Sequence, residues 1–172
     1  MSFGNFLRAR QLEPALALLL LRLWTGLEFA RAGWTKLSGG LQAPAWFRGL
    51  DFPVPHVWLP ANLNWVSAGV LELALGVALI VGLCTRWAAA ALIYIVFVAV
   101  YSVHFDLGWA GWNQIETDEG LGFKVPLMLA LMLFALFACG AGDWSLDRRL
   151  GRCRQRRGGY YCELSIGCIR PG

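Results

Sequence analysis

The chain contains 172 residues, of which 58% are hydrophobic and only 15% are charged, with 9 Trp and 10 Phe residues among them. A soluble domain of this length cannot bury so many apolar side chains, so the composition excludes an ordinary soluble globular protein and predicts a membrane protein.

Four apolar stretches are long enough to cross a bilayer, which requires about 20 mainly apolar residues in a helix. They lie at about 14–34, 63–83, 87–103 and 123–139. The first is too long and too charged for a cleaved signal peptide, so we expect it to remain as a helix. The short link 84–86 forces the second and third spans to run antiparallel. The prediction is an all-α, integral membrane four-helix bundle over residues 1–150.

The distribution of Lys and Arg predicts the orientation of this bundle. Ten of these residues flank one set of span ends or lie in the tail, whereas Lys36, Arg48 and Lys124 lie on the other side. Because positively charged short loops stay in the cytoplasm, both termini are expected to be cytoplasmic. Residues 151–172 are then a basic, disordered cytoplasmic tail. Its basic run is typical of contact with anionic membrane lipid rather than with nucleic acid.

The two outer loops have different compositions. Residues 35–62 mix four prolines with Trp and Phe, a pattern that favours a segment lying at the membrane interface. Within them, "PAWFRGL" predicts a short helical turn that begins near Pro44 and ends near Gly49. The other outer loop is acidic near its end, and Pro126 marks the expected start of the fourth helix.

Charged residues inside the spans are the main candidates for a site. Glu28, Arg31 and Glu72 are all predicted to lie in the outer half of the membrane, where one ionised side chain costs about 2.5 to 3.5 kcal/mol at mid-bilayer. Glu28 and Arg31 are three residues apart, so they share a helix face and can pair. Two interpretations stay open. The charges fix helix register, or they line a cavity for a small polar ligand, a quinone headgroup or a metal.

Further polar residues surround this layer. Arg22 lies nearly opposite Arg31 around its helix, so we expect it either to extend to the cytoplasmic surface or to pack against carbonyl groups. Tyr101, His104 and Asp106 end the third span just outside the glutamates. The spacing of His104 and Asp106 favours an interfacial or capping role over metal ligation, and we predict no metal site.

Catalytic signatures are absent from the sequence. Cys84 and Cys139 lie at the cytoplasmic span ends, and the other three cysteines lie in the tail, which argues against a thiol oxidase acting through outer disulfides. Nucleotide-binding, haem-attachment and hydrolase motifs are also missing. If the protein takes part in redox chemistry, another subunit is expected to carry the cofactor.

Several motifs together resemble the DoxX family of small bacterial membrane proteins. They are "RLWTGLEFARAGWTKLSG", "AWFRGLDFPVP", "GVLELALGVALIVGLCTRWAAAAL" and "GAGDWSLDRRL", and they cover residues 16–150. The resemblance implies an inner-membrane protein associated with oxidoreductase assemblies, since relatives include the quinone-reducing subunit DoxD. It also implies that Arg22, Glu28, Lys36 and Glu72 are the most important positions. Lys124 departs from the pattern, because relatives often carry an acidic residue there.

Two functional hypotheses follow. In the first, the protein is a membrane subunit of a quinone-linked oxidoreductase, and Glu72 or Glu28 handles protons as a catalytic residue. The ligand-binding residues would be Arg22, Arg31, Lys36, Tyr101, His104 and Asp106. In the second, it is a non-catalytic scaffold that recruits a soluble enzyme, or that assists export or metal stress tolerance. A homodimer is also predicted, with Gly69, Gly76 and Gly82 as close-approach surfaces.

Overall fold

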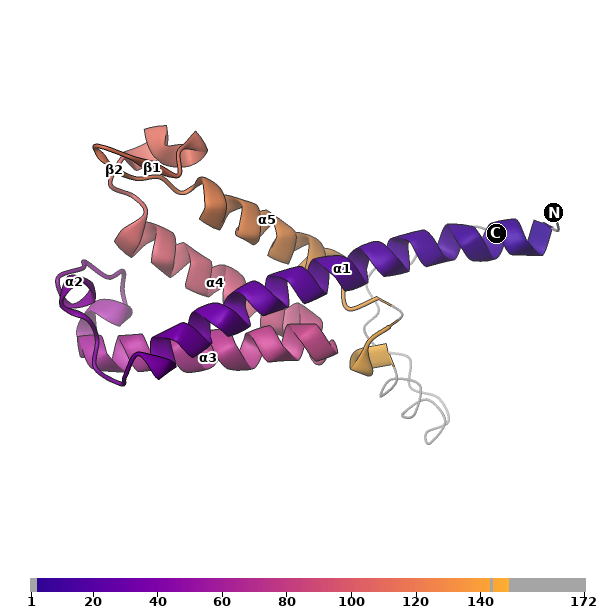
Figure 1. The fold of residues 1–172 in the computed structure, drawn as a ribbon, viewed down its shortest axis with the longest axis horizontal. Coiled ribbons are helices and arrows are strands. Elements are labelled where there is room, and N and C mark those ends of the chain that lie inside the picture. The colour runs from indigo at the N-terminus through magenta and orange to yellow at the C-terminus, as the bar shows by residue number, and fades with distance from the viewer. Residues whose placement is uncertain (1–2, 143, 149–172) are drawn as a thin grey trace.

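The computed structural model describes residues 3–142 and 144–148, with side chains described from Ala15 onward. Four long helices dominate the chain (Figure 1). They are α1 (Phe3–Ser38), α3 (Ala61–Val81), α4 (Thr85–Val103) and α5 (Lys124–Cys139). Three of them agree with the predicted spans to within about two residues at each end, as expected for boundaries read from sequence.

Short elements fill the two loops at one end of the helices. The first loop contains the helical turn α2 (Ala45–Arg48), which Pro44 and Gly49 flank as predicted, and the 3₁₀ helix η1 (His56–Trp58). The second contains the 3₁₀ helix η2 (Gly108–Asn113) and the strands β1 (Glu116–Thr117) and β2 (Gly120–Leu121). The strands pair antiparallel, with Glu116 opposite Leu121. The chain is therefore mostly helical rather than entirely α. Gly120, with φ of 150°, adopts the backbone conformation that this tight hairpin requires.

Helices α1 and α3 pack with their backbones in contact. A Cβ atom added at Gly76 would lie 2.6 Å from the Ala30 nitrogen and 2.8 Å from the Gly26 carbonyl oxygen. A Cβ added at Gly33 would lie 2.5 Å from the carbonyl oxygen of Gly69. The glycines therefore allow close helix approach within one copy of the chain. This finding corrects the prediction that Gly69 and Gly76 serve a dimer interface, because α1 already covers them.

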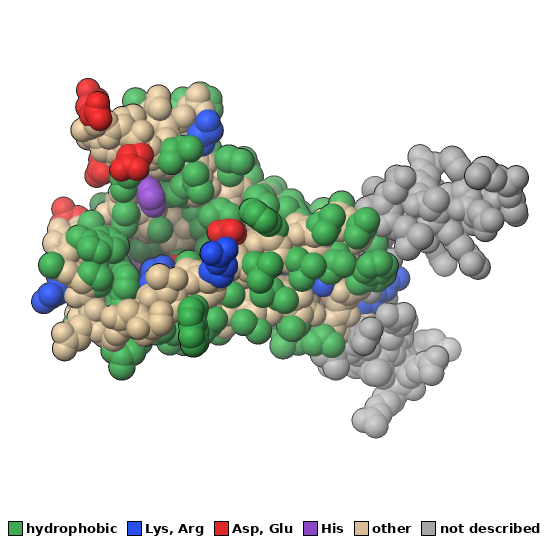
Figure 2. Space-filling model, in the orientation of Figure 1, with side chains coloured by type: hydrophobic (Ala, Val, Ile, Leu, Met, Phe, Trp, Pro, Cys, Tyr) green, Lys and Arg blue, Asp and Glu red, His purple; other side chains and the backbone are tan. Residues whose placement is uncertain are grey.

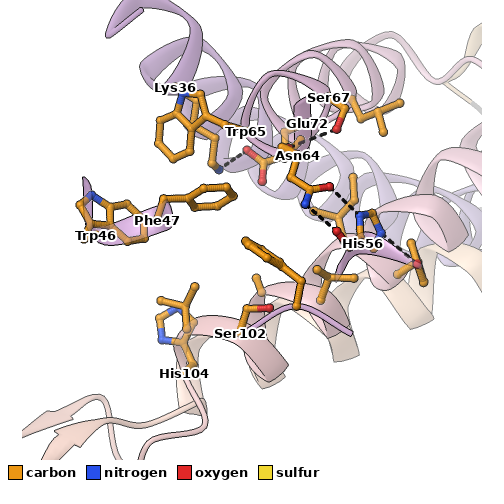
Figure 3. Close-up of a pocket in the computed structure, with 18 residues that line it drawn as sticks. Lys36, Trp46, Phe47, His56, Asn64, Trp65, Ser67, Glu72, Ser102 and His104 are labelled. Atoms are coloured by element: carbon orange, nitrogen blue, oxygen red, sulfur yellow. Dashed lines mark hydrogen bonds and ion pairs between the residues drawn. The ribbon is translucent and has the colours of Figure 1, made fainter. Parts of the chain in front are cut away.

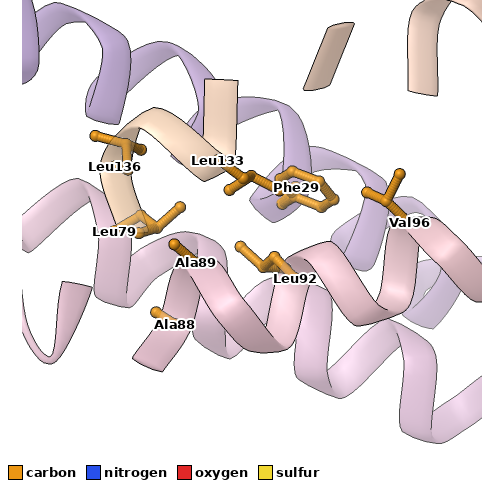
Figure 4. Packing of buried hydrophobic residues seen from close by; sticks show 8 residues of the cluster. All are labelled: Phe29, Leu79, Ala88, Ala89, Leu92, Val96, Leu133 and Leu136. Carbon is orange, nitrogen blue, oxygen red and sulfur yellow. The ribbon is translucent and has the colours of Figure 1, made fainter. Parts of the chain in front are cut away.

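A hydrophobic core joins all four long helices (Figure 4). The core draws one residue from α1, one from α3, four from α4 and two from α5, as follows: Phe29, Leu79, Ala88, Ala89, Leu92, Val96, Leu133 and Leu136. The small Ala88 and Ala89 side chains on α4 leave room for the larger leucines of α3 and α5, as close packing requires. This shared core fixes the relative positions of the elements that build the site.

Two of the helices, α3 and α4, are long and apolar enough to cross a membrane. Only 33% and 22% of their apolar windows are buried, whereas the core helix of a soluble protein is mostly buried. Helix α5 is also apolar but shorter, at 16 residues. The exposed apolar faces are what a lipid environment requires, because burial inside the protein does not account for them.

Helix α1 is longer than the span predicted at 14–34. It has 36 residues and its first part projects beyond the other three long helices (Figure 1). Its packed part includes Leu18 and Leu21, which lie against the hydrophobic core, and extends to Lys36, which contacts α3. The predicted span 14–34 lies within this helix.

Candidate functional site

A cavity of about 260 Å³ opens between the ends of α1, α3 and α4, beneath the first loop. Figure 2 shows the molecule hollowed at this end, with histidine and basic side chains at the hollow. We call this cavity the Glu72 pocket. Its lining combines polar and aromatic side chains, namely Lys36, His56, Asn64, Ser67, Glu72, Tyr94, Ser102, His104, Trp46, Phe47, Phe52 and Trp65.

An ion pair between α1 and α3 forms one wall of the pocket. The Lys36 Nζ atom donates a hydrogen bond of 2.5 Å to Glu72 Oε2 (Figure 3). The Glu72 side chain is only 8% exposed and the Lys36 side chain 25% exposed. Buried charges need such pairing, because desolvation of an isolated carboxylate is costly. The pair therefore places one acidic and one basic side chain at the pocket wall.

Aromatic side chains from the first loop and α3 cover the pocket. Phe47 contacts Trp65 and Phe52, each with a ring-centre distance of 5.0 Å, and Trp46 contacts Trp65 at 6.0 Å. Phe47 and Trp65 are also buried together with Ala43. The prolines and aromatics of the loop thus build a small apolar cluster of their own, which holds the loop against α3.

His56 links the loop to two helices. The Nδ2 group of Asn64 donates to the His56 carbonyl oxygen at 2.9 Å, so the Asn64 Oδ1 atom faces His56 Nδ1 at 3.1 Å as an acceptor. His56 Nδ1 therefore donates to Asn64, and His56 Nε2 pairs with the Tyr94 hydroxyl group at 3.0 Å. Asn64 and Tyr94 come from α3 and α4, so His56 holds the loop to both helices.

Ser102 and His104 lie across the cavity from Lys36 and Glu72 (Figure 3). Within the described residues, the buried Ser102 Oγ and His104 Nδ1 atoms have no hydrogen-bond partner. Burial lowers the pKa of His104, while the Gly122 backbone and the Asp106 carboxylate oppose that shift. His104 is therefore a neutral imidazole near pH 7. No group of three or more potential metal ligands occurs among the described side chains.

The structure brings together three of the predicted site residues. Lys36, Glu72 and His104 line the pocket, whereas Tyr101 is 53% exposed on α4 and is not part of the lining. The carboxylate of Asp106 accepts a hydrogen bond from the Leu121 backbone at 3.2 Å and so supports the β-hairpin. Tyr94, which lies seven residues before Tyr101 on the same helix, lines the pocket instead of Tyr101.

Glu28 and Arg31 lie outside the pocket. The contacts of Gly26 with Gly76 place Glu28 at a depth similar to that of Glu72. However, Glu28 is next to Phe29, which faces the core, so its side chain points about 100° away around the helix. Among the described residues the ion pair of Glu72 is with Lys36, and no ion pair joins Glu28 to Arg31. The predicted pairing is thus not observed.

Arg22 lies at the opposite end of the helices and is 2% exposed. Its guanidinium donates to the carbonyl oxygens of Ala141 at 2.6 Å and Trp144 at 2.7 Å. Packing against carbonyls was one of the two predicted alternatives for this residue. A place in the ligand site is not compatible with this position, because the guanidinium is taken up by the segment that follows α5.

Asp147 completes this second polar site. Its carboxylate accepts hydrogen bonds from the backbone nitrogens of Cys84 at 2.6 Å and Thr85 at 2.9 Å, so it caps the first turn of α4. The Asp147 nitrogen in turn donates to the Gly82 carbonyl oxygen at 3.0 Å. We call Arg22, Gly82, Ala141, Trp144 and Asp147 the Arg22 cluster. It ties the segment after α5 to the other three long helices.

His56, Asn64 and most of the aromatic lining were not predicted from the sequence as site residues. The available signal was the density of Trp, Phe and Pro in residues 35–62, which indicated an interfacial loop but gave no contact between that loop and Glu72. Such contacts depend on how the loop folds back over α3, and residue spacing does not encode them.

Comparison with known proteins identifies a matching family and relatives that cover most of the chain. The model of the family described as DoxX matches residues 17–105. The chain belongs to the DoxX family. A protein of Haemophilus influenzae, named only as uncharacterized, is 36% identical over 133 residues, covering 76% of this chain and 81% of the relative. An uncharacterized membrane protein of Mycobacterium tuberculosis is 29% identical over 140 residues, covering 79% and 82%.

No solved structure gives a significant match to the chain. Family membership and the apolar helices together make this a membrane protein. The family match contains α3, α4, Arg22, Lys36 and Glu72, and therefore includes the ion pair of the pocket.

Proposed function

We propose that this DoxX-family protein is a multi-pass protein of the bacterial inner membrane in which α1, α3, α4 and α5 all cross the bilayer. Helices α3 and α4 are long and apolar enough to cross a membrane, which supports this topology. The hydrophobic core that α1 and α5 share with them supports it as well. The excess of Arg at the Arg22 end supports cytoplasmic termini. Residues 1–150 then form one domain, and the basic tail 151–172, outside the described residues, contacts anionic lipid.

The function that we propose is binding of a quinone headgroup in the Glu72 pocket, as the membrane subunit of a quinone-linked oxidoreductase. The observation that carries it is the pocket itself, which places a buried ion pair opposite Ser102 and His104 beneath aromatic rings. A flat ring with two carbonyl groups needs apolar faces and polar groups on opposite edges. The pocket supplies both.

Reduction of a quinone to a quinol takes up two electrons and two protons. Lys36 is placed to stabilise negative charge that develops on one ligand oxygen, and Glu72 to pass protons taken up from water to the ligand, one for each of the two that the quinol gains. His104 and Ser102 are placed to hydrogen-bond the opposite edge. The electrons come from a soluble or membrane oxidoreductase partner. Glu72 is thus the proposed catalytic residue, with Lys36 and His104 as binding residues, and Glu28 loses that role.

Binding is tested by titrating the purified protein in detergent with a short-chain ubiquinone or menaquinone analogue. Trp46 and Trp65 line the pocket, so quenching of Trp fluorescence reports occupancy. Glu72→Gln is expected to weaken binding by about tenfold, the loss of one charged hydrogen bond. Asp51→Asn removes an exposed carboxylate outside the lining and is the matched control.

The competing hypothesis is a non-catalytic scaffold or accessory factor. It predicts that neither quinone analogue quenches fluorescence, and that Glu72→Gln leaves partner recruitment and any linked activity at the wild-type level. That combination of results would refute the quinone proposal.

A further inference from the structure

One face of α1 is exposed along most of the helix that packs on α3. Its residues alternate in spacing between three and four positions, which is the seven-residue repeat of helices that pack side by side. The apolar members are 50% to 65% exposed, and the full set is Leu20, Trp24, Leu27, Arg31 and Trp34. We call this set the α1 stripe.

Two ionisable side chains interrupt this apolar face. Arg31 is exposed within the α1 stripe, and Glu28 is half-buried beside it. In the described part of the chain, neither makes an ion pair or a side-chain hydrogen bond. Figure 2 shows an acidic and a basic side chain close together among hydrophobic side chains beside α1. If α1 crosses the bilayer as proposed, these charges face lipid, which is an unfavourable position for unpaired ions.

We propose that a second copy of the chain covers this face, with Glu28 of each copy pairing with Arg31 of the other. An interface with twofold symmetry brings the same patch of both copies together, so the patch must be self-complementary. One acid and one base on a shared face satisfy that condition. They are three residues apart, a rise of about 4.5 Å that these long side chains span.

The occupant is a second copy rather than an unrelated subunit because charge complementarity is already complete within the patch. The copies lie in the same orientation in the membrane, so their α1 helices run parallel, and Glu28 of one copy differs in depth from Arg31 of the other by only about 4.5 Å. Gly26 and Gly33 face α3 instead, so the α1 stripe is the surface of this part of the helix that remains for a second copy.

The contact is tested by disulfide cross-linking in lipid vesicles. Leu27→Cys is introduced into the full chain after its natural cysteines are changed to Ser. Phe97→Cys, at a 57% exposed position on α4, is the matched control. Leu27→Cys is expected to form at least about ten times more cross-linked dimer than Phe97→Cys, since parallel helices bring equivalent stripe positions together. Equal cross-linking at both positions would overturn the proposal.

A charge exchange tests the pairing itself. Arg31→Glu and Glu28→Arg each place like charges across the interface and are expected to raise the dimer dissociation constant at least about tenfold. The double variant Glu28→Arg with Arg31→Glu restores opposite charges and is expected to recover the wild-type value. Measurement is by energy transfer between labelled copies in vesicles. If the charges only pair within one helix, the single variants dimerise normally and the proposal fails.

The proposal rests on α1 lying in the membrane, and that premise has a separate readout. Leu27→Cys buried in lipid or protein resists a water-soluble maleimide. Rapid labelling would reject the membrane placement of α1, whereas protection without cross-linking would reject only the dimer.

Discussion

The Arg22 cluster and the Glu72 pocket lie at opposite ends of the same helices, and each contains a buried ionisable side chain, Arg22 of α1 in the first and Glu72 of α3 in the second. At the Arg22 cluster the guanidinium is closely packed, because a Cβ atom added at Gly82 would lie only 2.6 Å from Arg22 Nη1. At the Glu72 pocket a cavity lies beside the ion pair. The first arrangement fixes structure, and the second leaves space for a ligand.

Within the described residues, both sites contain polar atoms without a hydrogen-bond partner, so such atoms do not distinguish the structural site from the binding site. Arg22 Nε and Thr85 Oγ1 lack partners near the Arg22 cluster, just as Ser102 Oγ and His104 Nδ1 do at the pocket. The two sites differ in whether a cavity lies next to these atoms. A charge in a membrane helix is therefore evidence for binding only where the structure leaves a cavity at its side.

Replacing Arg22 is expected to have the largest effect on stability. Arg22→Met leaves the carbonyl oxygens of Ala141 and Trp144 without their donors, at a cost of about 3 kcal/mol in free energy of unfolding. Thermal unfolding in detergent measures the loss. Arg48→Met, at an exposed position on α2, is expected to stay within about 0.5 kcal/mol of wild type. The folded fraction of Arg22→Met should bind quinone as the wild type does. Loss of quinone binding in this variant would contradict the conclusion that the Arg22 cluster and the Glu72 pocket are independent sites.

The ion pair of the pocket is expected to show strong coupling between its two members. Lys36→Met and Glu72→Gln should each cost about 2 kcal/mol, because each leaves a polar partner behind. The double variant should cost less than the sum of the two, by about 1 to 2 kcal/mol, since the pair is broken only once. Chemical denaturation of the four proteins measures this difference. Strictly additive losses would show that the pair does not contribute to the folded state.

The cap of α4 is expected to have a moderate effect. Asp147→Ala removes both hydrogen bonds to the backbone of Cys84 and Thr85, and should cost about 1 kcal/mol. Asp51→Ala, at an exposed loop carboxylate, serves as the control and should leave the unfolding temperature almost unchanged. A similar loss in both variants would mean that Asp147 does not act as a cap.

The smallest expected effect is a pH dependence from His104. Burial lowers its pKa in the folded protein, so the unfolded chain binds the proton more readily. Stability should therefore fall as pH decreases from about 6.5 toward the lowered pKa, with a slope below about 1.4 kcal/mol per pH unit. Unfolding temperatures between pH 5 and 8 measure the slope, which His104→Gln should reduce. If the slope is unchanged in His104→Gln, the pH dependence of stability arises from other titratable groups.

Much of the fold follows from hydropathy because lipid imposes a simple rule on length and composition. The bounds of α3, α4 and α5 were predictable for this reason. The bounds of helix α1 were less predictable, since the helix runs from Phe3 to Ser38 and exceeds the predicted 14–34 at both ends.

The candidate site was predictable in depth but not in direction around the helices. Sequence spacing placed Glu28 and Glu72 at a similar level, yet only Glu72 faces the pocket. A rotation of about 100° per residue means that one position decides whether a side chain faces the core or the outside. The choice between Lys36 and Arg31 as ionic partner depends on which face of α1 meets α3.

The sequence by itself determined the DoxX family, the apolar helices and the presence of costly charges within them, because these depend on composition and local spacing. The tertiary structure decided which charges pair, which glycines are already used, and that the first loop folds over Glu72. Those outcomes depend on contacts between residues far apart in the chain. They arise only when the α1 and α3 backbones come together at Gly26 and Gly76.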